Sequence, residues 1–488
     1  MSLLRDNVLL TLRLVLGSFF RSIRVQGLEN VPQDRGGILV SWHVSGVIDP
    51  ALMVNTFPRE VVFGARHGLL KIPLIGKVLR EMDTVPIYRA EDLKNLSPEQ
   101  RREQNAGSLD ALAQAVAKGK FAALFPEGET HDNPYLSPIK SGAARFYYRA
   151  RQLQGIHSET EGDPSPVILP VGLFYDNKTL WRSDVLVVFH PPIELPEHLD
   201  FDPPPQATTE DLIEPARELR DLIETHLNAS VHATESWDLH RLMQRSASVV
   251  RAERDKRAGL VGQPASFQER VEGAGRIWEG HRALSDHDPK ALEVLLTRME
   301  RYDTDLVALG LEDGDLDQAP GLFSPSMVFL LLLQLAGLVL VMPPLLIIGL
   351  VVNWPATMIG WAATKRFSRS PRDDATVKIM VGTLTYPLSW VGAGLGAWRF
   401  AGWMQGHVDG MPDTAWLVGL LVGALSVLGG MAMLRYLRGL RETWRSLRVR
   451  LTRARAKVAL ARLKVERAEL YDLLMLAQER IALKDEMH

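Results

Sequence analysis

Three long stretches in the last third of the chain contain no Asp, Glu, Lys or Arg, and this feature constrains the fold more than any other. They are Gln318–Thr364, Ile379–Trp398 and Thr414–Leu434. A helix that crosses the hydrocarbon core of a bilayer needs about 20 predominantly apolar residues. The second and third stretches therefore predict single transmembrane spans.

The first apolar stretch is too long for one span and carries Pro343 and Pro344 near its centre. Because proline removes a helical hydrogen bond and clashes with the preceding turn, a break is expected there. We predict a hairpin that enters and leaves the membrane on one side. One long tilted span with a kink remains the alternative.

Basic residues around these stretches predict the topology. The loop after the first stretch and the tail after the third are basic, whereas the loop between the second and third has one Arg against two Asp. By the positive-inside rule, the first loop and the tail are cytoplasmic. With a hairpin, the N-terminal domain is cytoplasmic too. We therefore predict an integral membrane protein, in a bacterial inner membrane, with its N-terminal domain on the cytoplasmic side.

The N-terminal part of the chain has a different pattern, in which short β-branched runs alternate with helical ones. This alternation predicts an α/β fold with a mostly parallel sheet and flanking helices. The expected strands are Gly37–Trp42, Val61–Gly64, Phe121–Phe125, Val167–Leu173 and Val185–His190.

Composition divides the chain into five segments. Residues 1–24 are expected to form an interfacial helix, because their apolar run contains Arg5, Asp6 and Arg13 and no small-residue cleavage site follows. The remaining segments are an α/β domain at 25–200, a charged helical connector at 201–320, the membrane region at 321–434, and a basic helical tail at 435–488.

The basic tail carries apolar or small residues at helical three-four spacing. This stripe predicts a coiled coil or a helix packed against the protein, and through it a homo-oligomer. A basic amphipathic helix on anionic lipid is the equal alternative. The stripe consists of Leu437, Leu440, Trp444, Leu447, Leu451, Ala454, Val458, Ala461, Val465 and Ala468.

Overall composition excludes several classes of function. The 488 residues have a formal net charge of −2 with 23% charged residues, so bulk charge does not predict a nucleic-acid partner. Cysteine is absent, which excludes disulfides, thiolate catalysis and cysteine metal sites. The 13 His show no paired ligand spacing. We therefore expect no metal and no organic cofactor.

A histidine and an aspartate follow the first expected strand, in the run Ser41 to Pro50. Imidazole can remove a proton from an attacking hydroxyl near neutral pH, and a carboxylate on its other nitrogen fixes the tautomer. His43 and Asp49 are suited to these two roles. When such a pair stands alone, a surface turn is the more common explanation.

Two further motifs lie at strand ends. Phe125-Pro126-Glu127-Gly128 follows the strand at Phe121, where Gly128 suits a tight turn and Glu127 can accept hydrogen bonds from glycerol hydroxyls. Arg89 ends the run Thr84–Arg89, and the planar fork of an arginine suits phosphate. A solvated Glu and a solvated Arg are the ordinary explanations of each motif alone.

Together and in this order, the motifs resemble the glycerophospholipid acyltransferase family over roughly Gly27 to Leu195. Val167–Gly172, with Pro170, resembles the fourth motif of that family. Five residues separate His43 and Asp49 where the family usually has four, a variant associated with bacterial members. The family's Thr-Arg after Phe-Pro-Glu-Gly is replaced by Glu129-Thr130-His131, so the role of that Arg is not transferred.

The spacing from Lys140 to Arg145 and the run Tyr302–Leu306 also resemble the glycerol-3-phosphate/dihydroxyacetone-phosphate acyltransferase branch. The resemblance implies that His43 is the general base, Asp49 its orienting partner, and Arg89 a phosphate contact. It also implies that Glu127 and Gly128 belong to the acceptor site. We infer Lys140 as a second phosphate contact from its charge and position.

The expected function is transfer of a fatty acyl group from acyl-CoA or acyl-carrier protein to glycerol-3-phosphate or dihydroxyacetone phosphate at a membrane. The expected partners are thus membrane lipids, the acceptor and the acyl thioester. A lysophosphatidate or other lysophospholipid acceptor is the first alternative. A membrane scaffold with an inactive acyltransferase domain is the second, and a lipid transporter is disfavoured because the apolar stretches lack internal charges.

Overall fold

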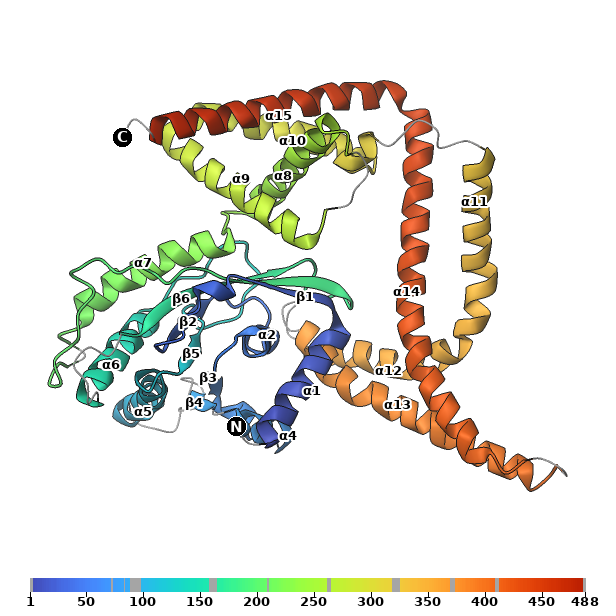
Figure 1. Cartoon of the computed structure of the whole chain (residues 1–488), viewed down its shortest axis with the longest axis horizontal. Helices are drawn as coiled ribbons and strands as arrows, with labels where there is room; N and C mark the ends of the chain where they lie inside the picture. The colour runs from blue at the N-terminus through green and yellow to red at the C-terminus, as the bar shows by residue number, and fades with distance from the viewer. Residues whose placement is uncertain are drawn as a thin grey trace. The chain divides into compact units, whose positions relative to one another are not determined.

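The computed structural model describes residues 3–71, 73–82, 84–87, 98–157, 165–208, 210–260, 265–317, 325–368, 374–408 and 412–485. The chain divides into two compact units (Figure 1). Unit 1 consists of Met1–Trp237 with Arg369–Thr376, and unit 2 of Asp238–Ser368 with Val377–His488. The two units are described separately. The five-segment division made from composition stays a prediction.

Unit 1 is built on a seven-stranded sheet with the strand order β1-β7-β6-β2-β5-β3-β4. Neighbouring strands are parallel except β6 and β7, which are antiparallel. The predicted α/β fold with a mostly parallel sheet is therefore confirmed. The strands are β1 (Phe20–Gln26), β2 (Gly37–Ser41), β3 (Val61–Arg66), β4 (Val85–Ile87), β5 (Phe121–Leu124), β6 (Val167–Tyr175) and β7 (Ser183–Phe189).

All five expected strands are present, with ends that differ by one or two residues. The edge strand β1 was not predicted. Its residues include Arg21 and Arg24, which break the apolar pattern, and its side chains are mostly partly exposed. An edge strand needs to bury less of its surface than a central one, so its sequence carries a weaker signal.

Helices cover both faces of this sheet. On one face, α5 (Pro98–Ala117), α6 (Gly142–His157) and α7 (Ile213–Val231) form a core with the alternate strand residues Ile38, Val40, Ala122 and Ile168. The other face is covered by α1 (Leu3–Phe19) and α2 (Ile48–Thr56). There the ring of Phe57, directly after α2, packs on Phe121 and Phe189 of the sheet. Two short helices complete the unit, α3 (His67–Leu70) and α4 (Pro73–Glu81).

Unit 2 is helical. Its first part holds α8 (Trp237–Arg257), α9 (Phe267–His287), α10 (Pro289–Ala308) and the short η2 (Asp313–Leu316). The apolar region follows as α11 (Pro325–Ala336), η3 (Gly337–Val341), α12 (Met342–Phe367), α13 (Asp374–Gln405) and α14 (Ala415–Arg455). The chain continues into α15 (Lys457–Asp485).

Helices α12 and α14 approach each other closely at a pair of glycines. A Cβ atom on Gly349 would lie 2.4 Å from the backbone of Gly429, so neither position accepts a side chain without a shift. Beside this crossing, Asn353 of α12 donates to the backbone oxygen of Ser426 (3.1 Å) and accepts from the indole of Trp390 (2.8 Å). Small residues and interhelical hydrogen bonds of this kind are typical of helix packing in membranes.

One helix in the described part of the chain, α14, is long and apolar enough to cross a membrane. Helices α12 and α13 also expose large apolar side chains, among them Ile347, Val351, Leu384 and Leu388. Phe329 of α11 is exposed as well, so four helices present apolar surface in the region where the sequence predicts membrane spans. The number of spans stays a prediction.

The long first apolar stretch is interrupted where the sequence predicts a break. The chain passes from α11 into α12 through the π-helical turn Gly337–Val341, directly before Pro343 and Pro344. Figure 1 shows that α11 and α12 run in different directions. Residues 318–324 lie outside the described residues. A hairpin that returns to its side of entry stays a prediction.

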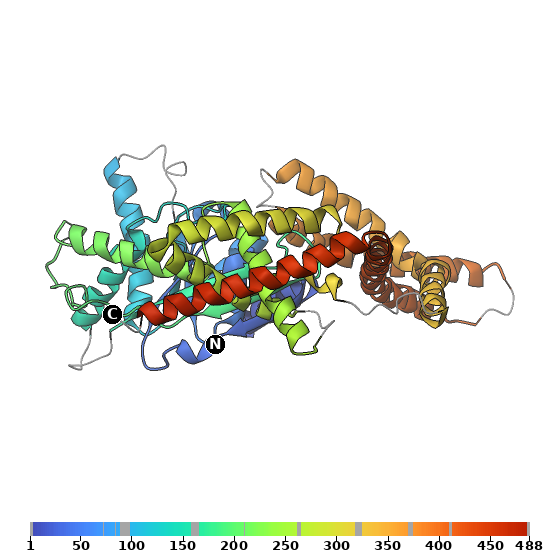
Figure 2. The same cartoon turned by 90° about the horizontal axis from the view of Figure 1, so that it is seen from above.

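The tail is a helix packed against unit 2, but not through the predicted stripe. Figures 1 and 2 show α15 running along α10, and it also contacts α9. The stripe residues Val458 and Val465 are 87% and 60% exposed, whereas Leu460, Leu463 and Leu470 are buried. This helix therefore packs on unit 2 through a face other than the stripe. The coiled coil, the lipid-bound helix and the homo-oligomer stay predictions.

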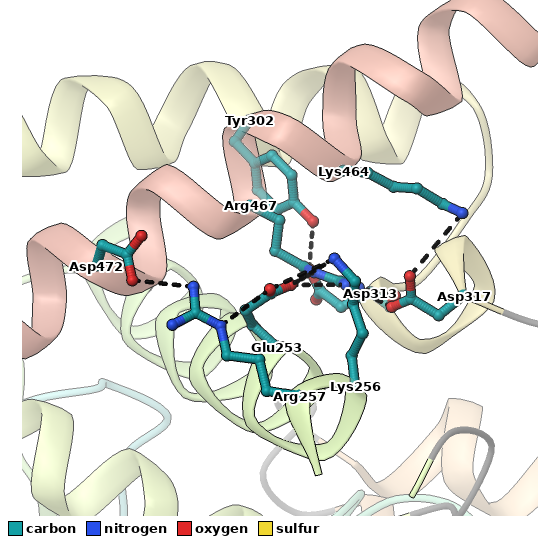
Figure 3. Close-up of polar contacts among 9 residues, drawn as sticks. All are labelled: Glu253, Lys256, Arg257, Tyr302, Asp313, Asp317, Lys464, Arg467 and Asp472. Carbon is teal, nitrogen blue, oxygen red and sulfur yellow. Dashed lines mark hydrogen bonds and ion pairs between the residues drawn. The ribbon is translucent and has the colours of Figure 1, made fainter. Parts of the chain in front are cut away.

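The buried face of α15 includes a charged residue. Arg467 is fully buried and lies between Leu463 and Leu470 on this face. Its guanidinium donates to the Glu253 carboxylate (2.9 and 3.1 Å) and to the Asp313 backbone oxygen (2.8 Å), and it forms an ion pair with Asp317 (Figure 3). A hydrophobic pattern treats an arginine as a surface residue, so the sequence did not predict this second, buried face.

Candidate active site

The carboxyl ends of the parallel strands bring the sequence motifs together. His43 lies two residues after β2, Phe125 directly follows β5, and Tyr175 ends β6. Strands β5 and β6 both pair with β2 in parallel, so these three ends lie at one edge of the sheet. In open α/β sheets, this edge is where ligands bind.

His43 and Asp49 are in direct contact. The Nδ1 atom of His43 lies 2.9 Å from Oδ2 of Asp49. Asp49 is fully buried in the first turn of α2, whereas the His43 side chain keeps 18% of its surface exposed. With Nδ1 directed at the carboxylate, Nε2 is the ring atom left for a substrate, and it has no hydrogen-bond partner among the described residues.

The five residues between His43 and Asp49 form a turn at Gly46, which brings the two side chains together. Gly46 has a positive φ of 35°, and the backbone N–H of Ile48 donates to the Ser45 oxygen (2.8 Å) as α2 begins. The N–H of Ser45 then donates to Oδ2 of Asp49 (2.7 Å). The extra residue relative to the four-residue box is therefore compatible with a His–Asp contact.

The imidazole of His43 stacks on an aromatic ring from the neighbouring strand end. The ring centroids of His43 and Phe125 lie 4.2 Å apart, with an interplanar angle of 21°. The ring fixes the plane of the imidazole, while Asp49 fixes its tautomer. Phe125 belongs to the motif Phe125-Pro126-Glu127-Gly128, but its contact with His43 was not predicted from the sequence.

Glu127 links the two motifs from inside the protein. It is 1% exposed, and its carboxylate accepts from the backbone N–H of His43 (3.0 Å) and of Ser137 (2.7 Å). His131 forms an ion-pair contact with the same carboxylate, and its backbone N–H donates to the His43 oxygen (3.0 Å). One oxygen of Glu127 thus holds the backbone of His43, and the other holds Ser137 and His131. Contact with an acceptor hydroxyl stays a prediction.

Gly128 and Lys140 lie side by side at the surface of the same loop. Gly128 has a φ of 71°, and a Cβ atom there would lie 2.7 Å from Nζ of Lys140. The backbone N–H of Lys140 donates to the Pro126 oxygen (3.1 Å), which fixes the base of the side chain. Lys140 itself is exposed. Its ammonium group is placed where it can meet an anionic ligand.

Of the predicted site residues, Arg89 lies outside the described residues. The strand β4, which ends at Ile87, runs parallel to β3 and so ends at the same edge of the sheet as β2 and β5. Two residues that sequence reasoning missed are at the site. Lys178 donates to the Val44 oxygen (2.9 Å) and to Asp132 (2.6 Å), and the Tyr175 hydroxyl donates to Oδ1 of Asp49.

The sequence placed Tyr175 near the end of an expected strand but gave no indication of its partner. It stands two residues beyond the expected strand Val167–Leu173, next to the strand that leads to His43. The strand order alone makes the two ends neighbours, and strand order was not predicted. Without it, a tyrosine far from Asp49 in the sequence gives no reason to be paired with it.

Residues 22–173 match the model of the family described as Acyltransferase. This match covers the described motifs from β1 to the greater part of β6. The chain carries a domain of the acyltransferase family. This match, together with the relatives named below, confirms the predicted resemblance to glycerophospholipid acyltransferases.

Several known proteins are similar to this acyltransferase domain. The 1-acyl-sn-glycerol-3-phosphate acyltransferase of Borreliella burgdorferi is 25% identical over 174 residues, which are 34% of this chain and 59% of that one. The chloroplastic 1-acyl-sn-glycerol-3-phosphate acyltransferase BAT2 of Brassica napus is 29% identical over 175 residues, or 36% and 46%. An uncharacterized acyltransferase of Schizosaccharomyces pombe is 23% identical over 272 residues, 39% of each chain.

The similarity thus spans between 39% and 59% of the length of these three relatives. Among solved structures, the 1-acyl-sn-glycerophosphate acyltransferase PlsC of Thermotoga maritima aligns with 46% of this chain and 81% of its own. The TM-score is 0.31 and the identity 19%.

Proposed function

We propose that the chain is a membrane-bound O-acyltransferase that moves a fatty acyl group from a thioester donor to the hydroxyl of a glycerol-phosphate-type acceptor. The observation that supports it most directly is the His43–Asp49 pair, with the Nε2 atom of His43 left without a partner among the described residues. Such a pair is suited to remove a proton from an alcohol. No side-chain nucleophile and no acyl-enzyme are required.

In the proposed reaction, Nε2 of His43 takes the proton of the acceptor hydroxyl as its oxygen attacks the thioester carbonyl. The new C–O bond forms, the C–S bond breaks, and the proton passes from His43 to the leaving thiolate. Asp49 stabilises the imidazolium that forms in between. The proposed chemistry uses no metal or organic cofactor, and the thioester is a substrate.

Backbone amides are the proposed donors to the developing oxyanion. The two turns that contain glycine differ in this respect. The N–H of Gly128 donates to the Phe125 oxygen (3.0 Å) and is occupied. The N–H of Gly46 has no hydrogen-bond partner among the described residues, so we favour the turn at Gly46.

Two considerations bear on the identity of the acceptor, and they favour different compounds. The motif resemblance around Lys140 favours glycerol-3-phosphate or dihydroxyacetone phosphate, and the exposed ammonium beside Gly128 suits a phosphate group. The names of the bacterial and plant relatives favour 1-acyl-glycerol-3-phosphate instead. Arg89 remains a proposed phosphate contact in either case.

Purified protein supplied with acyl-CoA and each of the three acceptors separately distinguishes these possibilities. The acceptor with the highest kcat/KM identifies the reaction. The same assay with acyl-carrier protein as donor compares the two thioesters. Transfer to none of the three acceptors from either donor would contradict the proposed function.

Replacing the proposed base is the direct test of the mechanism. His43→Ala is expected to lower kcat by about 10²-fold to 10⁴-fold, the usual contribution of a general base. The matched control is His198→Ala, because His198 is an exposed histidine of the same unit that pairs with Glu218. A His43→Ala protein that still transfers acyl groups would refute His43 as the base. A natural protein that transfers no acyl group would instead favour the alternative of a membrane scaffold with an inactive domain.

We also propose that unit 1 lies on the cytoplasmic side of a bacterial inner membrane, where acyl carriers can reach it. The natural absence of cysteine makes this testable with single engineered thiols. Glu197→Cys in unit 1 and Asp413→Cys before α14 both replace exposed residues. An impermeant maleimide added outside intact cells is expected to label only the second, and labelling of the first alone contradicts the topology.

A further inference from the structure

Tyr175 meets the candidate catalytic pair from the opposite side of the carboxylate. It is the last residue of β6 and pairs with Val185 of β7, so its backbone position is fixed by the sheet. Its hydroxyl donates to Oδ1 of Asp49, the oxygen that faces away from His43. No other contact to Oδ1 is found among the described residues.

The two oxygens of Asp49 are thus held at separate points. Oδ2 accepts from the Ser45 N–H (2.7 Å) and contacts Nδ1 of His43 (2.9 Å), while Oδ1 accepts from Tyr175. Asp49 is fully buried. Without the tyrosine hydroxyl, a buried carboxylate oxygen has no donor, and the carboxylate can rotate about its last bond.

The hydroxyl remains a donor over the whole working range of pH. Burial and the adjacent charge of Asp49 both raise the pKa of Tyr175 well above its ordinary value of 10.0. A phenol that keeps its proton can only donate to the carboxylate.

We propose that Tyr175 is a positioning residue for the His43–Asp49 pair, and that it sets the pH at which His43 becomes a base. The proposal rests on the proposed function, in which His43 must be neutral to accept a proton. Loss of the hydroxyl leaves Asp49 more basic, so the pair holds its proton more tightly. The acid limb of the pH profile of kcat/KM then moves to higher pH.

The test compares Tyr175→Phe with Tyr148→Phe, assayed with acyl-CoA and the best of the three acceptors. Tyr148 is a buried tyrosine of the same unit whose hydroxyl donates to the Leu199 oxygen (3.1 Å), so its variant controls for loss of a buried hydroxyl. Tyr175→Phe is expected to lower kcat by about 10-fold to 100-fold, the consequence of an unsatisfied buried acceptor. KM is expected to change less than about twofold, and the acid limb to move upward.

Substitution of Tyr175 by difluorotyrosine keeps the ring and the hydroxyl, and it covers the case in which the Phe variant does not fold. Fluorine makes the phenol a stronger donor, so the acid limb is expected to move in the opposite direction, to lower pH. An acid limb that stays in place in the fluorinated protein overturns the proposal. So does a Tyr175→Phe protein with unchanged kcat and pH profile.

The His43→Ala protein, measured alongside, separates the two hypotheses. If His43→Ala is inactive while both Tyr175 substitutions leave the profile unchanged, only the positioning role is wrong. If His43→Ala retains acyl transfer, the proposed base itself is wrong.

Discussion

Each unit of the chain contains a buried polar cluster, and the two clusters differ in how completely their charges are paired. The Asp49 cluster of unit 1 consists of Asp49, His43, Ser45 and Tyr175. The Arg467 cluster of unit 2 consists of Arg467, Glu253, Asp313, Asp317 and Tyr302 (Figure 3). Both centre on a side chain with 0% exposure.

In the Arg467 cluster, every charged side chain is paired with a group of opposite charge. The guanidinium meets two carboxylates and a backbone oxygen, and Asp313 in turn accepts from Tyr302 (2.6 Å) and from Arg245 (2.8 Å). In the Asp49 cluster, the carboxylate faces an imidazole and hydrogen-bond donors, and one imidazole nitrogen has no partner among the described residues. Burial is common to both clusters. The open nitrogen is what makes one of them suitable for chemistry.

The largest effect is expected from a substitution that removes the negative charge of Asp49 but keeps the shape of its side chain. Asp49→Asn keeps an oxygen for His43, and its amide can donate to the Tyr175 hydroxyl. The imidazolium, however, loses its opposite charge. We expect kcat to fall by about 10²-fold to 10⁴-fold with little change in melting temperature. An activity near that of the natural protein would show that the carboxylate plays no part in the reaction.

Breaking the Arg467 cluster is expected to cost stability instead of chemistry. Arg467→Met removes the buried guanidinium from the Glu253 and Asp317 carboxylates, which keep only more exposed cations as partners. Removal of one partner of a comparable buried pair destabilises by about 3–5 kcal/mol. Denaturation of unit 2 in detergent micelles, followed by circular dichroism, measures this effect.

The matched control for that substitution is Arg462→Met on the same helix. Arg462 is 63% exposed and pairs with Asp305 at the surface, so the loss is expected to stay within about 1 kcal/mol. Equal losses in the two variants would mean that burial of the Arg467 cluster contributes nothing to stability.

An intermediate effect is expected from Glu127, which is buried like the Arg467 cluster but supports the His43 loop. Glu127→Gln replaces one acceptor oxygen by an NH₂ group that faces a backbone N–H, at a cost of about 1–3 kcal/mol. Melting temperature and kcat are both expected to fall. The comparison is with Glu129→Gln, an exposed neighbour, for which neither is expected to change.

The smallest expected effect is a pH dependence of the Arg467 cluster. Burial opposes the ionisation of Glu253, but hydrogen bonds from Arg467 and Arg257 hold its pKa below the ordinary 4.5. The ionised carboxylate therefore stabilises the fold at pH values above about 4.5, and this stabilisation is lost as the pH falls through the lowered pKa. Melting temperature against pH is expected to fall less steeply in acid for Glu253→Gln than for the natural protein, and parallel curves would exclude this contribution.

The sequence alone determined the fold class and the identity of the motifs. Continuous apolar runs such as Phe121–Phe125 and Val167–Leu173 follow from the need to bury a central strand on both faces. This need is local. The same holds for the uncharged stretch Thr414–Leu434, which falls within the long helix α14. The His43–Asp49 pairing was also accessible, because the two residues lie on one short loop.

Only the tertiary structure decided which distant groups meet. Tyr175 reaches Asp49 because β6 lies beside β2, and the carboxylate of Glu127 turns inward to the His43 loop instead of outward to solvent. The face of α15 that is buried was decided by Arg467 finding partners on α8 and beside η2. A buried charge is favourable only when its partners are already in place, and those partners come from other elements, so local sequence cannot reveal it.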